Sequence, residues 1–335
     1  MKIGTIVGLL LAVLMSAGQV LAAGAPPLPA TAVPDTVGER TYLVHKLSKE
    51  EFQVISKFNE REQVVWSFSL KDWGTWNIFW LALADNSEKE PTTTMINRRQ
   101  IAGGGTDWEY VYHGGPVKSG AMEWMGGNHG NEDLVALTLI GDGERIDLKK
   151  LPVGRERTFR RVQIQEDTHL VNSNMDGDVA AITRLYEVVP NGLQLTTTTE
   201  WLQDLWLDIG YPAMYPISKT YGRYWRFAGY PKTYSVPGPG QTTNQFYGFV
   251  DTTETTFWGD EDPSVRTRAW IEDRAAVLDW KYTADRTRVW DIGASQVKLY
   301  YASFSNKGPA PVAKGTKWVV TRGWDIWREA PGATP

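Results

Sequence analysis

Apolar and polar residues alternate with a period of two along most of the chain after residue 64, a pattern that predicts β-strands. From Trp108 to His113, for example, the aromatic residues fall on one face of an extended chain and His113 falls on the other. Segments rich in β-branched and aromatic residues predict strands at 64–70, 76–84, 108–113, 134–140, 144–148, 158–165, 168–171, 180–189, 193–201, 245–255, 266–272, 277–282, 288–292, 297–304 and 317–326.

Turn sequences join several of these segments into hairpins. Gly141-Asp142-Gly143 and Pro190-Asn191-Gly192 supply the residues that tolerate the positive φ of tight hairpin turns. About fifteen short strands with few helical segments predict an all-β fold: a large antiparallel β-sandwich of the jelly-roll or supersandwich type, with one or two short helices. We expect a single domain over residues 40–330, with 234–243 as the best position for a boundary.

Two segments depart from the strand pattern. Residues 48–59 predict a helix, because Ser48 is a good N-cap and the apolar residues Phe52, Ile55 and Phe58 follow at helical spacing. Residues 211–240 combine tyrosine and arginine with many prolines and glycines, which predicts loop or an irregular edge strand.

The N-terminal residues have the features of an export signal. Lys2 precedes an apolar run from Ile6 to Val20, and small residues allow a cut near Ala22, so residues 1–23 are interpreted as a signal peptide. Residues 24–39 form a linker rich in proline and alanine. A retained membrane anchor is the alternative. We therefore expect a periplasmic or secreted bacterial protein that does not associate with a membrane after cleavage.

Composition narrows the function further. The chain has no cysteine, which excludes disulfides and thiol chemistry, and its formal net charge of −4 does not favour binding to nucleic acid. It has 16 Trp, 14 Tyr and 10 Phe. Many of these rings are expected to fill the core, and the remainder suggest faces that stack on sugar rings. The expected partner is therefore a glycan.

The stretch from Trp108 to Gly130 is the best candidate for a functional site. It contains His113, Asn128 and His129, and a Gly-Gly pair flanks each histidine cluster. Glycine lets the backbone take up positive φ and approach a ligand closely, so these pairs suggest two loops shaped around a ligand. The alternative is that the glycines are ordinary turn residues and that the histidines make only local hydrogen bonds.

Several classes of chemistry find little support in motifs. The chain has no Gly-x-Ser-x-Gly nucleophile motif and no HExxH zinc motif, so we expect no cofactor and keep a divalent metal as an alternative. Hydrolysis by a pair of carboxylates stays open. The candidate metal ligands are His113, His129, His169 and Glu132, and the candidate carboxylates are Glu123, Glu132, Asp133 and Glu200.

Cleavage of a uronic-acid polymer by β-elimination fits the residue types better. This reaction needs a base for the proton on C5, an acid for the leaving oxygen and a group that neutralises the sugar carboxylate. Histidine and tyrosine serve as base or acid, whereas asparagine and arginine bind a carboxylate. The candidates are Asn128, His129, Arg184, Tyr186, Tyr215, Tyr221, Arg223, Tyr224 and Arg226.

An exported, cysteine-free chain with many aromatic residues, a histidine in a glycine-rich loop and a Tyr/Arg-rich segment resembles the β-sandwich and jelly-roll polysaccharide lyases as a class. The resemblance lies in the general character of the mature chain, without a diagnostic motif. It implies that His129 is the base and that Tyr221 or Tyr224 is the acid. It further implies that Asn128, with Arg223 or Arg184, neutralises the carboxylate. The remaining site candidates are His113 for catalysis and Glu132, Arg226 and Trp225 for substrate binding.

Three alternatives remain open. The segment 221–227 also fits an edge strand whose rings pack inward and whose arginines are solvated. A noncatalytic glycan-binding or cell-envelope protein would keep the aromatic surface without the catalytic groups. A metal-dependent or carboxylate-based glycoside hydrolase is the third possibility.

Overall fold

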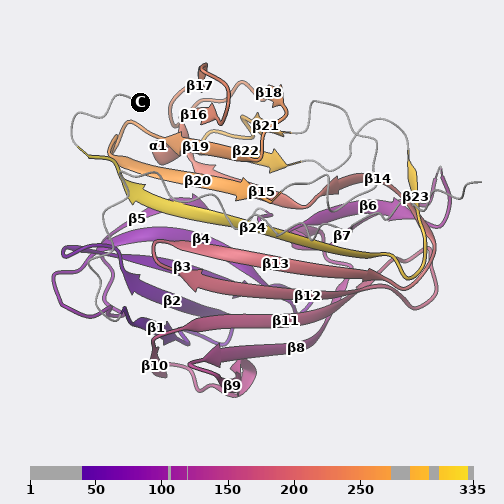
Figure 1. Cartoon of the computed structure of the whole chain (residues 1–335), viewed down its shortest axis with the longest axis horizontal. Coiled ribbons are helices and arrows are strands. Elements are labelled where there is room, and N and C mark those ends of the chain that lie inside the picture. Colours follow the sequence, from indigo (N-terminus) through magenta and orange to yellow (C-terminus); the bar gives the residue numbers. More distant parts are fainter. Residues whose placement is uncertain (1–39, 105–106, 119, 273–286, 302–308, 331–335) are drawn as a thin grey trace, which may run out of the picture.

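The computed structural model describes residues 40–104, 107–118, 120–272, 287–301 and 309–330. Within these residues the chain forms two ten-stranded sheets and one four-stranded sheet, in which all pairings are antiparallel. The two large sheets pack face to face and share one apolar core (Figure 1). The predicted all-β sandwich is therefore confirmed.

The first large sheet contains the N-terminal strands and part of the C-terminal half. Its strands in order are β10 (Glu156–Phe159), β1 (Tyr42–His45), β2 (Glu51–Lys57), β3 (Glu62–Leu70), β4 (Trp76–Asp85), β5 (Ile96–Gly103), β15 (Ala213–Ser218), β22 (Gln296–Tyr301), β21 (Thr287–Trp290) and β18 (Phe246–Val250).

The second large sheet contains most of the long hairpins. Its strands in order are β17 (Thr233–Ser235), β16 (Tyr224–Phe227), β19 (Glu254–Trp258), β20 (Val265–Ile271), β24 (Lys317–Arg328), β13 (Gly192–Trp201), β12 (Asp178–Val189), β11 (Val162–Val171), β8 (Glu132–Gly141) and β9 (Glu144–Asp147). The hairpins predicted at residues 141–143 and 190–192 are found between β8 and β9 and between β12 and β13.

The four-stranded sheet has the order β23 (Ala310–Val312), β14 (Leu205–Tyr211), β6 (Val111–Gly115) and β7 (Glu123–Met125). It packs through a separate apolar cluster against one end of β11, β12 and β13, where Leu170, Ile182 and Trp201 lie. The helical segments in the described residues are α1 (Lys219–Gly222), η1 (Gly127–His129) and η2 (Leu148–Lys150).

Alternation explains the inner sheet faces. Along β11 every second residue is buried, because successive side chains point to opposite faces of the sheet; the buried face carries Val162, Ile164 and Leu170 together with the polar residues Glu166 and Thr168. Most of the large rings are structural, as the sequence suggested. The tryptophans that are almost completely buried are Trp66, Trp108, Trp201, Trp225, Trp270 and Trp324.

Two local predictions are wrong. Residues 51–57 of the predicted helix form strand β2, which pairs with β1 and β3 and is covered on both faces. A segment buried on both faces loses the polar alternation that distinguishes a strand from a helix. Residues 211–240 are also more regular than expected, because β15 is an inner strand despite Pro216. Its pairing with β5 is limited to Ile217, which reduces the cost of a missing N–H.

The strand predicted at 277–282 lies outside the described residues. In the part of the chain that is described, no helix has the length and apolar character needed to cross a membrane.

Candidate functional site

A β-bulge brings Asp208 to His113. In the pairing of β6 with β14, Gly114 lies opposite Leu207 and His113 lies opposite Ile209, so Asp208 is an extra residue in its strand. Bulges of this kind change the direction of a side chain. Oδ1 of Asp208 lies 2.6 Å from Nδ1 of His113. The carboxylate therefore fixes the orientation of the imidazole.

The turn η1 positions the second histidine. Gly126, Gly127 and Gly130 all have positive φ, between 57° and 80°. At Gly127 a Cβ atom would lie 2.5 Å from Oδ1 of Asp107, so only glycine fits there. The glycine-rich stretch that the sequence singled out is thus required for the turn that carries His129.

Trp124 contacts both histidines. On β7 it lies directly opposite His113, and the two ring centroids are 4.7 Å apart. The imidazole of His129 stacks on the same indole, with centroids 4.9 Å apart and an interplanar angle of 18°. The structure therefore brings together the two histidines that the sequence predicted. We call His113, Trp124, His129, Asp107 and Asp208 the His–Trp site.

Asp107 connects His129 to a buried lysine. Its Oδ2 lies 2.9 Å from Nζ of Lys298 and 3.9 Å from Nε2 of His129, and its Oδ1 accepts the backbone N–H of Asn128. Burial alone would raise the pKa of Asp107, but Lys298 and the Asn128 N–H outweigh burial and hold it below its usual value. Asp107 therefore stays ionised near neutral pH.

The pKa of His129 is lowered. Burial of the imidazole is the largest cause, and the positive charge of Lys298 adds to it, whereas Asp107 acts in the opposite direction. His129 is therefore neutral at pH 7. Its side chain is 39% exposed, which leaves it accessible to a ligand. A neutral, accessible imidazole is suited to accept a proton.

Aromatic rings continue the His–Trp site toward β22 and β21. The ring of Tyr211 lies nearly parallel to Trp124, with centroids 6.4 Å apart, and meets Tyr300 edge-on at 4.9 Å. The hydroxyl of Tyr211 accepts a hydrogen bond from Nη2 of Arg288 at 3.0 Å. Apolar rings with a few fixed polar groups are typical of ligand sites.

A hollow of about 520 Å³ opens beside Asn128. Lys71, Trp73 and Phe79 are among its lining residues. Burial lowers the pKa of Lys71, while the carboxylates of Glu109, Asp107 and Asp72 oppose this effect. The hollow thus offers an amide, an ammonium and two aromatic rings next to the turn that carries His129, together with the carboxylates of Glu50, Glu51 and Asp72.

The predicted binding residues Arg184 and Glu132 lie in the interior of the sandwich instead. Nη2 of Arg184 is 3.1 Å from Oε1 of Glu132 and 3.0 Å from Oε2 of Glu166, and all three side chains are 0% exposed. Tyr110 and Thr168 donate hydrogen bonds to Glu132. Because two buried acidic side chains surround the guanidinium, this network is a structural element of the core, out of reach of a ligand.

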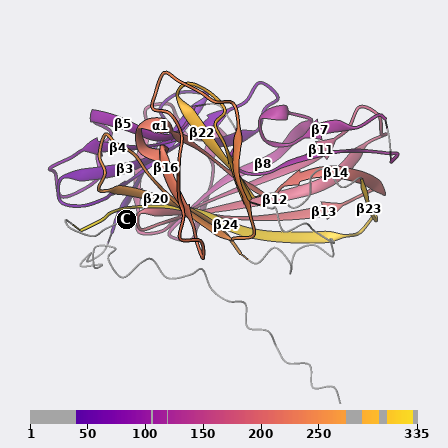
Figure 2. The ribbon, with the colours of Figure 1, turned by 90° about the horizontal axis from the view of Figure 1, so that it is seen from above.

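The Tyr221 segment does not join the histidines. Trp225 is 0% exposed and packs in the core, and Tyr221 is buried, which raises its pKa. Both views place α1 and β16 toward one end of the molecule and β7 toward the other (Figures 1 and 2). The described structure therefore does not bring His129 together with Tyr221 or Tyr224, the pairing of base and acid that the resemblance implied. The polar and aromatic side chains of this segment contact other residues instead. Arg223 donates a hydrogen bond to Asp260, Arg226 donates one to Thr233, and the ring of Tyr224 stacks on Trp258.

The reason is that β16 is a strand near the sheet edge. Its burial alternates: Trp225 and Phe227 are buried, whereas Tyr224 and Arg226 are half-buried. This agrees in part with the edge strand that the sequence left open as an alternative, because residues 219–222 form the helix α1 instead. Tyr224 and the two arginines remain partly accessible, at a location separate from the His–Trp site.

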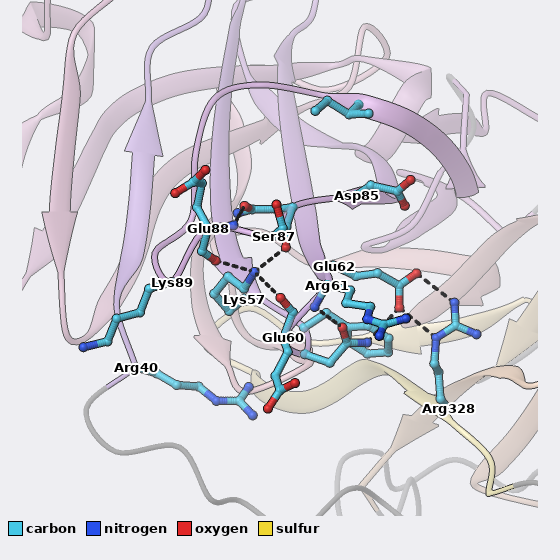
Figure 3. Close-up of a pocket in the computed structure, with 14 residues that line it drawn as sticks. Arg40, Lys57, Glu60, Arg61, Glu62, Asp85, Ser87, Glu88, Lys89 and Arg328 are labelled. Carbon is cyan, nitrogen blue, oxygen red and sulfur yellow. Dashed lines mark hydrogen bonds and ion pairs between the residues drawn. The ribbon is translucent and has the colours of Figure 1, made fainter.

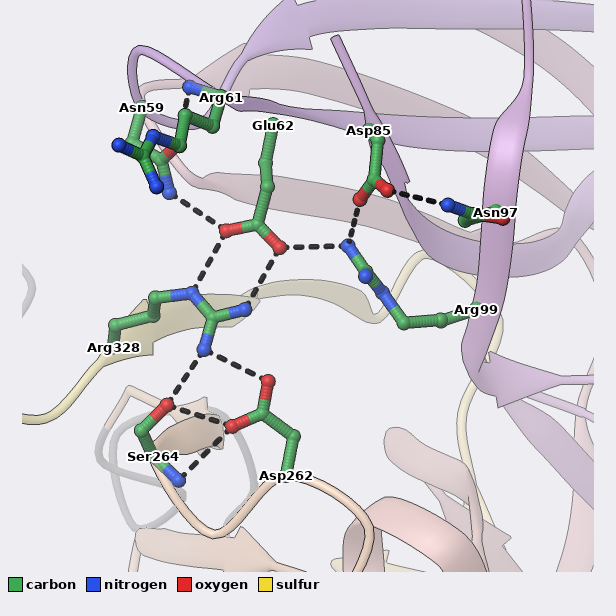
Figure 4. A network of polar contacts seen from close by, with 9 residues as sticks. All are labelled: Asn59, Arg61, Glu62, Asp85, Asn97, Arg99, Asp262, Ser264 and Arg328. Atoms are coloured by element: carbon green, nitrogen blue, oxygen red, sulfur yellow. Dashed lines mark hydrogen bonds and ion pairs between the residues drawn. The ribbon is translucent and has the colours of Figure 1, made fainter.

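A larger hollow of about 1380 Å³ lies beside the loops that follow β2 and β4 and the C-terminal end of β24 (Figure 3). Several of its charged groups are engaged with one another. Lys57 donates to the carbonyl oxygens of Asn86 and Glu88, and Arg328 binds both carboxylate oxygens of Glu62 at 2.7 Å (Figures 3 and 4). Arg99 approaches the same carboxylate (Figure 4). These contacts join β24 to β3 and are structural.

The remaining histidines are separate from the site. His169 pairs with Asp178 at 2.5 Å on the solvent face of β11 and β12, and His45 lies on β1. Among the described residues, no group of three or more histidine, aspartate or glutamate side chains is arranged to hold a metal ion.

Sequence reasoning missed several residues around the histidines. Asp107 and Trp124 lie within or beside the stretch that it selected, so proximity in sequence was an available signal. Asp208, Tyr211, Arg288, Lys298 and Tyr300 come from distant strands, and no local motif marks them.

No protein-family model matches the chain, and no curated protein matches it at a significant level. Among solved structures, it is similar to an α-galactosidase from Lactobacillus brevis, with 8% identity and a TM-score of 0.48 over 85% of this chain. The chain spans 40% of the length of that protein.

Two other solved structures are similar over most of the chain. A GH36 α-galactosidase from Geobacillus stearothermophilus has 8% identity and a TM-score of 0.45, with 86% of this chain and 41% of that one covered. A Salmonella typhimurium protein assigned as a mutarotase has 8% identity and a TM-score of 0.38, with 89% and 97% covered. Likenesses of this size carry no conclusion about activity.

Proposed function

We propose that this chain is an exported carbohydrate-active protein that cleaves an acidic polysaccharide by β-elimination at the His–Trp site. The observation that carries the proposal is the pair of imidazoles on Trp124, of which His129 is neutral at pH 7 and accessible. An accessible neutral base beside a second, carboxylate-bound imidazole provides two groups for acid–base catalysis.

In the proposed reaction, His129 removes the proton from C5 of a uronate unit. The electron pair of the C5–H bond forms the C4=C5 double bond, and the C4–O bond breaks. His113, which Asp208 orients through Nδ1, delivers a proton to the leaving oxygen from its other ring nitrogen. His113 thus takes the role of the acid, which the resemblance gave to Tyr221 or Tyr224. Those two residues belong to α1 and β16, which lie away from β7 (Figures 1 and 2).

The sugar carboxylate becomes more negative as C5 loses its proton, so a partner is needed for it. Asn128 and Lys71 line the hollow next to His129 and supply an amide and an ammonium group. We propose that Asn128 and Lys71 bind the sugar carboxylate. The reaction uses side chains alone, so a chelator is expected to leave it unchanged.

The test is an assay with the mature protein on oligogalacturonates and alginate oligomers, followed by the ultraviolet absorbance of the unsaturated product. Absorbance that rises with time, and persists with chelator, supports the lyase. Release of reducing ends without this absorbance indicates a hydrolase and overturns the proposed reaction. Export is tested separately by sequencing the N-terminus of the protein recovered from the periplasm, which should begin near Ala23 or Gly24.

A noncatalytic glycan-binding role is the second candidate. It is favoured by the exposed rings of Phe246 and Phe249, which are 42% and 46% exposed. Binding of the same oligomers without turnover in any buffer from pH 5 to 9 would select this role over the lyase.

A further inference from the structure

The edge strand β18 has a bulge that presents two aromatic rings to solvent. In its pairing with β21, Gly248 lies opposite Arg288 and Val250 lies opposite Thr287, so Phe249 is the extra residue. Phe249 has a φ of 55°, in the left-handed region that bulky residues avoid. Its ring is nevertheless 46% exposed. The strained backbone is therefore not offset by burial of the side chain.

The ring of Phe227 constrains the backbone of this bulge at Gly248. Gly248 has a φ of 101°, and a Cβ atom there would lie 2.6 Å from the ring of Phe227. Close packing against Phe227 thus holds the strand in the conformation that strains Phe249. Strain of this kind is concentrated at ligand clamps and active sites, and it is maintained because the surrounding structure enforces it.

The exposed rings are connected to the His–Trp site through Arg288. The guanidinium is almost buried and lies over four rings, at 5.4 Å from Phe246, 5.9 Å from Phe249, 5.6 Å from Tyr211 and 5.9 Å from Tyr300. Cation–π contacts hold the rings in place. One cation thus fixes rings from β18, β22 and β14 as a continuous surface.

Trp290 completes the cluster. Its indole stacks on Phe246 at 5.2 Å, and its Nε1 donates to Oδ1 of Asn244, which sets the orientation of the ring. We call Phe246, Phe249 and Trp290 the aromatic edge. Rigid rings with an accessible face at the end of a polar site are suited to the apolar face of a sugar.

We propose that the aromatic edge is a second carbohydrate subsite, which binds a sugar unit of the same chain whose uronate unit is cleaved at the His–Trp site. This inference rests on the proposed function. The ring contacts pass from Trp124 and Tyr211 on the four-stranded sheet to Tyr300 and Phe246 on the first large sheet, so the ligand is an oligosaccharide that extends across these two sheets. The subsite recognises ring faces, so it accepts neutral and acidic units alike.

The test measures affinity as a function of chain length. Oligogalacturonates and cello-oligosaccharides of one to six units are titrated by calorimetry, in the His129→Ala background so that no cleavage occurs. We expect affinity to rise with length. Adding Phe246→Ala should lower the affinity for the longest oligomers about tenfold and leave monosaccharide binding unchanged.

Phe249→Gly separates binding from folding. Glycine adopts positive φ without strain, so the melting temperature should stay the same or rise, while the affinity for long oligomers falls. The matched control is Val135→Ala on β8, because Val135 is 57% exposed and lies on the other large sheet. It should change neither quantity.

Three outcomes overturn the subsite. One is affinity that does not depend on chain length, another is equal loss for short and long oligomers, and the third is binding of phosphatidylcholine vesicles through Phe246 without any sugar dependence. If the unaltered protein still cleaves uronate oligomers in these cases, the proposed function stands and only the subsite fails. If it neither binds nor cleaves them, both proposals fail.

Discussion

The imidazole of His129 lies flat on the indole of Trp124, with ring centroids 4.9 Å apart. Stacking restricts rotation of the imidazole, and the η1 turn beneath it is held by glycines with positive φ. His113 meets the same indole at 4.7 Å. Trp124 thus presents two imidazoles as a fixed pair, and preorganisation of this kind is what acid–base catalysis requires.

Replacement of His129 by alanine should abolish β-elimination, with a loss of at least about 10²-fold in rate. The melting temperature should change by only a few degrees, because a half-exposed turn residue contributes little to the core. Turnover by ultraviolet absorbance and unfolding by circular dichroism check both points. The matched control is His169→Ala, whose imidazole is also 39% exposed and also pairs with a carboxylate. Equal loss in both variants would contradict the assignment.

Charge substitutions around His129 should move its pKa in opposite directions. Asp107 raises this pKa and Lys298 lowers it. Asp107→Asn should therefore lower the pKa further, and Lys298→Met should raise it. The imidazole proton resonances of His129, followed by NMR titration, measure each shift. The low-pH limb of the rate profile should move with them. Shifts of the same sign in the two variants would show that the Asp107–Lys298 pair does not control His129.

Stability should depend on pH through Glu166. Burial is the largest cause of the raised pKa of Glu166, which lies at about 8. The nearby Glu132 raises this pKa further, whereas Arg184 lowers it. The folded state therefore holds this proton more tightly than the unfolded chain, whose Glu pKa lies near 4.3. The contribution to stability is present below pH 4 and is lost as pH rises through 8.

Glu166→Gln tests this expectation, because glutamine cannot titrate. Between pH 5 and 9 the melting temperature of the unaltered protein should fall more than that of the variant. Scanning calorimetry at several pH values measures the difference. Parallel curves for the two proteins would mean that Glu166 keeps one protonation state throughout.

The Arg328–Glu62 pair should contribute to the junction of the two large sheets. Arg328→Met removes a bidentate contact to a mostly buried carboxylate and should cost about 1–3 kcal/mol in the free energy of unfolding. Urea unfolding measures this cost. Arg157→Met is the control, because its partner Glu144 is 57% exposed and such surface pairs contribute about 0–1 kcal/mol. A cost for Arg328→Met no larger than that of the control would contradict a structural role.

Much of the fold follows from local pattern. β11, β12 and β13 have one buried and one exposed face, so their residues alternate clearly, and Asn191-Gly192 marks the turn between two of them. β2 is covered on both faces and lacks this alternation, which is why its apolar residues also fit a helix. Burial on both faces therefore makes a short apolar run ambiguous, although β3 and β4, which are also buried on both faces, are predicted as strands from their β-branched and aromatic residues.

The site could be predicted only in part. Glycines with special backbone requirements identified the η1 turn and thus His129. Alternation placed Arg184 and Tyr186 on one face of β12, but it does not reveal that this face points inward, because the compensating Glu132 and Glu166 lie on other strands. Asp208 reaches His113 only through a bulge. Such contacts depend on strand register, which a sequence does not display.

The four-stranded sheet that carries His113 and Trp124 has an apolar cluster distinct from the main core. This cluster also contains residues of β11, β12 and β13, so substitutions in β6, β7 and β14 that leave the shared residues unchanged should alter the reactive groups with the least effect on the main core. Laboratory evolution of ligand preference should therefore tolerate more change in β6, β7 and β14 than in β3 or β4.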